Sequence, residues 1–168
     1  MEDFAQVYGL YPADKYERAG YGHIARVMWA EAGQESYSEF LRRLVFTVCI
    51  GNGDMHLKNW SLIYRNPTRP AISPAYDFVP TIAFIEDDRL GLSLGGSKDF
   101  QSVTVEKFKK IAAQAMAPDK LTLKVVGETL DRISDVWSNR RDELPLRDEI
   151  KAILDEHMSK LPLLNTRR

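Results

Sequence analysis

An amphipathic segment that leads directly into a polar loop dominates the middle of this sequence. From Tyr37 to Val48, apolar residues recur at spacings of three and four, which is the period of one face of an α-helix. Ser36 and Glu39, just before this run, have the Ser-x-x-Glu form of a capping box, whose side chains satisfy free backbone donors and mark a helix start. The sequence therefore predicts a long helix that starts at Ser36 and presents the loop following Gly51 at its end.

Apolar periodicity predicts further helices on both sides of this centre. The expected helices cover residues 3–8, 22–32, 105–115, 121–137 and 146–161. Thr104 is the candidate cap of the third of these, and Pro162 stops the last, because proline cannot continue a helix. A loop that contains Pro12 and Gly20 separates the first two.

The segment after the polar loop has the pattern of strands. Residues 60–64 alternate between apolar and polar side chains, Asn66-Pro67 is typical of a turn, and residues 71–73 can pair back as a second strand. Residues 89–94 also alternate, up to Gly95-Gly96. The expected fold class is therefore mainly α with a small central β-hairpin.

Length and composition narrow the class of protein. A chain of 168 residues is expected to form one domain, residues 1–168. The net charge of −1 lacks the basic excess of a nucleic-acid-binding domain, so no direct nucleic-acid contact is expected.

Cys49 is the only cysteine, which excludes an internal disulfide and is compatible with a reducing compartment. The longest apolar run, Leu44 to Ile50 interrupted by Thr47, is far shorter than the ~20 residues of a membrane span. The acidic start lacks the positive charge of a secretory signal, and a cytoplasmic protein is expected.

The polar loop has the residue types and spacing of a phosphotransfer site. Asp54 and Asn59 are five residues apart, as in the catalytic loop of protein kinases. There the aspartate accepts the proton of the substrate hydroxyl, and the asparagine oxygen holds Mg²⁺. Asp77, which follows the hairpin, can supply a second oxygen ligand, since Mg²⁺ binds through one or two protein oxygens plus nucleotide phosphates.

Each of these residues has a second interpretation. His56 is either a metal ligand or a hydrogen-bonded loop residue, and Lys58 either contacts a phosphate or is solvated. Asp77 could instead cap a helix beginning near Phe78. The run at residues 52–54 is also typical of an ordinary turn.

Two longer strings bear a family resemblance. Ile50-Gly-Asn-Gly-Asp-Met-His-Leu-Lys-Asn-Trp-Ser61 and Ile72-Ser-Pro-Ala-Tyr-Asp-Phe78 closely resemble the C-terminal domain of HipA-like serine/threonine protein kinases, bacterial toxin–antitoxin components and their relatives. The family loop reads Gly-Asn-x-Asp-x-His-x-Lys-Asn-Phe-Ser, so Trp60 replaces a phenylalanine. Shorter likenesses occur at residues 2–9, 15–16 and 22–25.

This resemblance implies a protein-kinase-like C-lobe and assigns roles to its residues. Asp54 resembles the catalytic base, with Lys58 as a supporting catalytic position. Asn59 and Asp77 resemble the magnesium ligands, with His56 as a supporting position of the cofactor site. The implied cofactors are Mg²⁺ and ATP. The implied partners are a protein substrate with a serine or threonine, and either a HipB-like antitoxin or a separate N-lobe.

The resemblance also sets an expectation about activity. Family kinases have an N-terminal lobe that grips the nucleotide, and the sequence as given is expected to lack it. Because positioning provides most of the catalysis in phosphoryl transfer, the chain is expected to be inactive without a complementing lobe. Two alternatives remain open. One is a non-catalytic module that engages an antitoxin or a kinase half. The other is a metal-dependent hydrolase that uses Asp54, His56 and Asp77.

Overall fold

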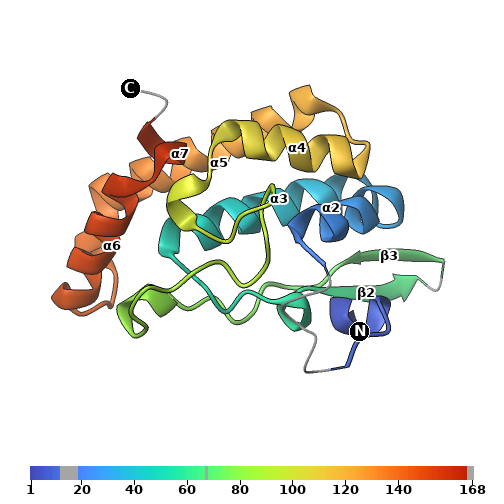
Figure 1. The fold of residues 1–168 in the computed structure, drawn as a ribbon, viewed down its shortest axis with the longest axis horizontal. Coiled ribbons are helices and arrows are strands. Elements are labelled where there is room, and N and C mark those ends of the chain that lie inside the picture. Colours follow the sequence, from blue (N-terminus) through green and yellow to red (C-terminus); the bar gives the residue numbers. More distant parts are fainter. Residues whose placement is uncertain (12–18, 67, 166–168) are drawn as a thin grey trace.

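The computed structural model describes residues 1–11, 19–66 and 68–165. A layer of helices packs against a small antiparallel sheet (Figure 1). The layer consists of α2 (Tyr21–Ala30), α3 (Gly33–Ile50), α4 (Val105–Ala115) and α5 (Asp119–Arg140). The prediction of a mainly helical fold with a central hairpin is confirmed. The predicted loop residue Pro12 and the pair at residues 15–16 lie outside the described residues.

Helix α3 is the central element, and its start differs from the prediction. It begins at Gly33, with Ala32 at the N-cap position, so the predicted capping box at Ser36 is wrong. The reason is that Gly33, with φ of +80°, turns the chain between α2 and α3. Ser36 therefore lies inside the first turn of α3 and not before it. The Ser36 hydroxyl instead accepts a hydrogen bond from the backbone N–H of Ile72.

The sheet has one strand more than the sequence predicts. It consists of β1 (Glu2–Asp3), β2 (Ser61–Asn66) and β3 (Arg69–Ile72), in the order β1-β2-β3. The hairpin pairs Leu62 with Ile72, and β1 adds a two-residue edge. Residues 89–94 form no strand. There the chain packs closely against the polar loop, since a Cβ atom on Gly91 would lie 2.9 Å from the Gly53 carbonyl oxygen.

Further helices at the two ends of the chain complete the fold. Near the N-terminus, α1 (Phe4–Val7) has a capping box formed by Asp3 and Gln6. At the other end, α6 (Asp148–Lys160) and α7 (Pro162–Asn165) pack at the end of the helical layer (Figure 1). Single 3₁₀ turns occur at Leu57–Asn59, Thr81–Ala83, Phe100–Ser102 and Arg141–Glu143.

The core lies between the helices and the sheet. Trp60 is the largest fully buried side chain of this core. The centre of the Trp60 ring lies 4.9 Å from the ring centre of Phe40 and 6.1 Å from that of Tyr21. Cys49 is buried as well, and burial raises the pKa of its thiol to about 12. A thiol in that state packs as a small apolar group. Among the helices of the described residues, none combines the length and apolar character needed to cross a membrane.

Candidate functional site

The polar loop begins where α3 ends. Gly51 caps the helix in the left-handed conformation, with φ of +63°, and a Cβ atom there would lie 2.4 Å from Ile82 Cδ1. This position therefore requires glycine for both conformation and space. The loop that follows closes on the carbonyl oxygen of Asp54, which accepts hydrogen bonds from the His56 backbone N–H at 2.8 Å and from Asn59 Nδ2 at 2.9 Å. The Asp54 side chain is exposed, whereas Asn59 is buried.

Asn52 connects this loop to Asp77. Its Oδ1 accepts a hydrogen bond from the Asp54 backbone N–H at 3.1 Å, and its Nδ2 donates to the Asp77 carbonyl oxygen, also at 3.1 Å. Asn52 is 1% exposed, so both ends of a buried amide are satisfied. Sequence reasoning saw only a turn residue here, because one of its two partners lies 25 residues further along the chain.

Asp77 is held in an unusual backbone conformation. Its φ is +62°, in the left-handed region that non-glycine residues adopt only where the surroundings compensate the cost. The next helical turn begins only at Thr81, so the interpretation of Asp77 as the cap of a helix starting at Phe78 is wrong. Its carboxylate is exposed at the surface beside the loop.

Tyr76 makes a second connection between the two segments. Its hydroxyl donates to the Lys58 carbonyl oxygen at 2.8 Å and lies 2.5 Å from Ser61 Oγ. The Lys58 side chain is exposed. The predicted site residues Asp54, Lys58, Asn59 and Asp77 therefore belong to one hydrogen-bonded unit, joined through Asn52 and Tyr76.

His56 lies beneath the exposed carboxylate of the loop. It is 6% exposed, and its Nε2 is 3.9 Å from Asp54 Oδ1. Among the described residues, no three His, Cys, Asp or Glu side chains converge on a possible metal position. The structure therefore does not assemble Asp54, His56 and Asp77 into the metal-binding triad that the hydrolase alternative requires.

A pocket of about 630 Å³ opens on one side of Asp54. The segment after Asp77 forms its far wall, and the lining includes Gly53, Asp54, Ile85, Asp87, Leu90 and Lys98. Thr81 fixes this wall, because its hydroxyl accepts from the Gly53 backbone N–H at 2.6 Å and donates to Asp88. Asp54 borders the pocket, whereas Asn59 and Asp77 do not line it. Sequence reasoning missed Thr81 and Asp88, since neither belongs to a motif.

The donor atoms near the loop suit a hard cation. Asn59 uses its amide nitrogen to donate to Asp54, which leaves its Oδ1 as the atom able to bind a metal. Together with the Asp77 carboxylate this gives oxygen donors only, the type that Mg²⁺ prefers. The residues present therefore fit Mg²⁺, and its binding by Asn59 and Asp77 stays a prediction.

The fold and the loop place the chain in the class of kinase-like C-terminal lobes, and comparison with known proteins identifies the family. The model of the family described as "HipA-like C-terminal domain" matches residues 1–137. The chain belongs to this family, which confirms the resemblance found in the sequence.

Three similar proteins show how much of a relative the chain covers. "Putative kinase Y4dM" of Sinorhizobium fredii is 40% identical over 164 residues, which are 97% of this chain and 40% of that protein. "Putative kinase Y4mE" of the same organism is 25% identical over 68% of this chain and 29% of its own length. HipA of Shewanella oneidensis, solved in a toxin–antitoxin complex with HipB and operator DNA, superposes with a TM-score of 0.75. That match has 18% identity and covers 96% of this chain and 42% of HipA. The chain therefore spans about two fifths of the length of Y4dM and of this HipA.

Proposed function

We propose that this chain is the catalytic C-lobe of a HipA-like, ATP-dependent protein serine/threonine kinase. The observation that carries the proposal is the amide of Asn52, which ties the exposed Asp54 to the Asp77 segment. A phosphotransfer site needs a base and its metal ligands at fixed positions, because catalysis there consists mainly of positioning and charge stabilisation.

In this proposal Asp54 orients the substrate hydroxyl and accepts its proton. The pocket beside Asp54 would receive the serine or threonine of a protein substrate, since the proposed base is one of its lining residues. Asn59 and Asp77 would hold Mg²⁺, which when bound neutralises charge on the transferred phosphate. Lys58, exposed in the same loop as the base, would contribute a positive charge toward the same phosphate.

The nucleotide clamp is a separate requirement. The chain corresponds to about two fifths of Y4dM and of the Shewanella HipA, so the phosphate-holding lobe would come from a further segment or a partner. We expect the chain by itself to bind Mg-ATP weakly and to transfer little phosphate.

The test combines calorimetric titration with ATP, with and without Mg²⁺, and labelled phosphate transfer in the presence of a complementing N-lobe. Asp54→Asn is expected to lower transfer by about 100-fold or more without a change in folding, because its side chain is exposed. Asp77→Asn is expected to weaken Mg-ATP binding. Asp142→Asn, an aspartate 92% exposed and outside the site, is the control. Normal turnover by Asp54→Asn would contradict the proposal.

A second candidate function is a non-catalytic module that engages an antitoxin. It is favoured by one observation, that the structurally similar Shewanella HipA is found in a complex with HipB. This function predicts binding to a HipB-like protein that Asp54→Asn and Asp77→Asn leave unchanged, with no phosphate transfer under any condition. Measuring both binding and transfer on the same variants separates the two functions.

A further inference from the structure

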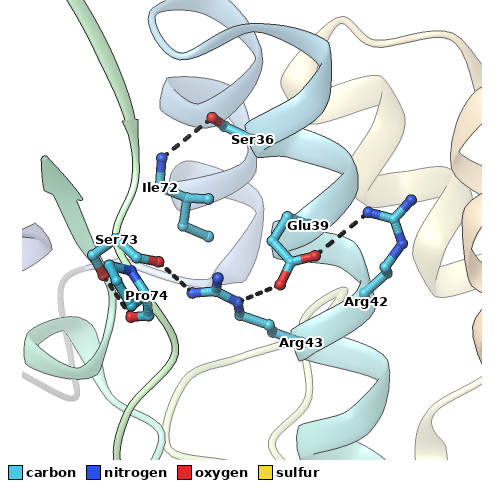
Figure 2. Close-up of polar contacts among 7 residues, drawn as sticks. All are labelled: Ser36, Glu39, Arg42, Arg43, Ile72, Ser73 and Pro74. Carbon is cyan, nitrogen blue, oxygen red and sulfur yellow. Dashed lines mark hydrogen bonds and ion pairs between the residues drawn. The ribbon is translucent and has the colours of Figure 1, made fainter. Parts of the chain in front are cut away.

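A row of polar side chains on α3 faces the end of β3 (Figure 2). Ser36, Glu39 and Arg43 follow one another at spacings of three and four, which places them on one face of the helix. Ser36 Oγ accepts from the Ile72 backbone N–H at 3.2 Å, and Arg43 donates through a terminal nitrogen to the Ser73 carbonyl oxygen at 2.8 Å. The row therefore holds the chain at the point where it leaves β3.

The guanidinium of Arg43 is fixed by two acceptors. Besides the Ser73 carbonyl, its Nε donates to Glu39 Oε1 at 2.8 Å. The Arg43 side chain is 14% exposed and that of Glu39 is 38% exposed. Hydrogen bonds with a charged donor are roughly twice as strong as neutral ones, and the planar guanidinium keeps its donors in a fixed arrangement. Arg43 is therefore a rigid link between α3 and Ser73.

This link fixes one end of the segment that ends at Asp77. Ser73 is held by Arg43, and Asp77 is held by Asn52. Both anchors depend on α3, because Arg43 belongs to the helix and Asn52 follows directly after Gly51, its C-cap. Helix α3 thus supplies two of the contacts that position Asp77 relative to the loop that contains Asn59, beside the Tyr76 contact to Lys58.

We infer that Arg43 is a positioning residue for Asp77. By holding Ser73, Arg43 keeps the Asp77 carboxylate at the distance from Asn59 that a shared Mg²⁺ requires. The inference rests on the proposed function, since that function assigns Asn59 and Asp77 to the metal. Without Arg43 the Asp77 side chain stays chemically intact, but the segment from residue 73 to 77 loses its charged anchor to α3. The hydrogen bonds of the Ser73 N–H to Ser61, of Tyr76 to Lys58 and of Asn52 to Asp77 remain. Loss of residues that orient metal ligands typically lowers metal affinity about 10-fold or more.

The test follows Mn²⁺ binding by the backbone NMR signals of Asn59 and Asp77. Mn²⁺ accepts the same oxygen ligands as Mg²⁺, and its unpaired electrons broaden nearby signals. In the unmodified chain, both signals should broaden with one apparent Kd. In Arg43→Met that Kd should rise about 10-fold, and Arg43→Lys should recover part of the affinity because lysine keeps one charged donor.

Arg42→Met is the matched control. Arg42 precedes Arg43 on the same helix and also pairs with Glu39, at 3.4 Å, but its side chain is 49% exposed. It lies on the side of Glu39 away from Ser73 (Figure 2). We expect its variant to bind Mn²⁺ like the unmodified chain. Equal Mn²⁺ affinity in Arg43→Met and Arg42→Met would overturn the inference.

Hydrogen exchange keeps the inference testable if the metal assignment fails. If the unmodified chain shows no Mn²⁺ broadening at Asn59 and Asp77, the proposed magnesium site is wrong. Positioning by Arg43 is then decided by amide exchange in residues 73–78. Faster exchange there in Arg43→Met, but not in Arg42→Met, supports the positioning role, and unchanged exchange in both variants rejects it.

Discussion

At the scale of single residues, the buried amide of Asn52 is the key polar contact of the site. Asn52 is almost fully buried, and it bonds to the backbone of Asp54 on one side and of Asp77 on the other. A buried polar group contributes mainly because losing its partner is costly. The left-handed φ of Asp77 also needs such a contact to persist.

The first prediction concerns Asn52→Ala. It leaves the Asp77 carbonyl and the Asp54 N–H without this partner, so the free energy of unfolding should fall by about 1–3 kcal/mol. Urea unfolding measures this change. Asn139→Ala is the control, because Asn139 is exposed on α5 and bonds only to Asp135 among the contacts seen for it. Equal free energies of unfolding for the two variants would show that the Asn52 contacts do not stabilise the fold.

The same variant should weaken the metal site. With the Asp77 carbonyl released from Asn52, Mn²⁺ affinity at Asn59 and Asp77 should fall by about 10-fold. The Mn²⁺ titration described for Arg43 measures it, and Asn139→Ala should bind like the unmodified chain.

At the scale of elements, a histidine of α6 makes a polar contact with α3. His157 Nε2 lies 2.8 Å from the Val48 carbonyl oxygen, and the His157 ring meets Phe100 edge-on at 5.2 Å. Burial lowers the pKa of His157 below its ordinary 6.5, and Lys160 acts in the same direction, whereas the hydrogen bond to Val48 acts against it. Helical periodicity places His157 on the inner face of α6, but the carbonyl that it contacts lies 109 residues earlier.

The lowered pKa of His157 predicts a pH effect on stability. Below pH 6.5 the unfolded chain takes up this proton more readily than the folded chain, so protonation favours unfolding. The contribution of His157 is therefore fully present above pH 6.5 and is lost as the pH falls through the folded-state pKa. Melting temperatures measured across this range should fall less steeply for His157→Gln than for the unmodified chain. Parallel curves would show that His157 does not titrate differently on folding.

At the scale of the whole molecule, α3 organises the fold. It buries ten of its 18 residues and contacts α2, α5, α6 and β3. Its C-terminus begins the polar loop, and its polar face anchors the segment before Asp77 (Figures 1 and 2). By contrast, only two residues of α6 are buried, Lys151 and Leu154.

This difference predicts the order of local opening. Amides in α3 between residues 40 and 48 should exchange most slowly, close to the rate of global unfolding. Those in α6 should exchange much faster, because elements with little buried surface open locally. Hydrogen exchange followed by mass spectrometry measures both regions in one sample. Equal protection of α3 and α6 would indicate that the whole chain opens as a single unit.

The sequence by itself determined the local features of this protein. The helices, the hairpin and the Asp54–Asn59 spacing depend on residues close together in the chain, where periodicity and turn chemistry act directly. The joined strings at residues 50–61 and 72–78 were also long enough to identify the HipA-like family.

Only the tertiary structure decided how these parts meet. It showed that Ser36 bonds to Ile72 instead of capping its helix, and that Asp77 is strained instead of capping one. It also showed that Asn52, Tyr76 and Arg43 hold the site together. Each of these contacts joins residues 18 to 36 positions apart, a separation at which local preference carries no signal. Their geometry is set instead by how α3 packs against the sheet.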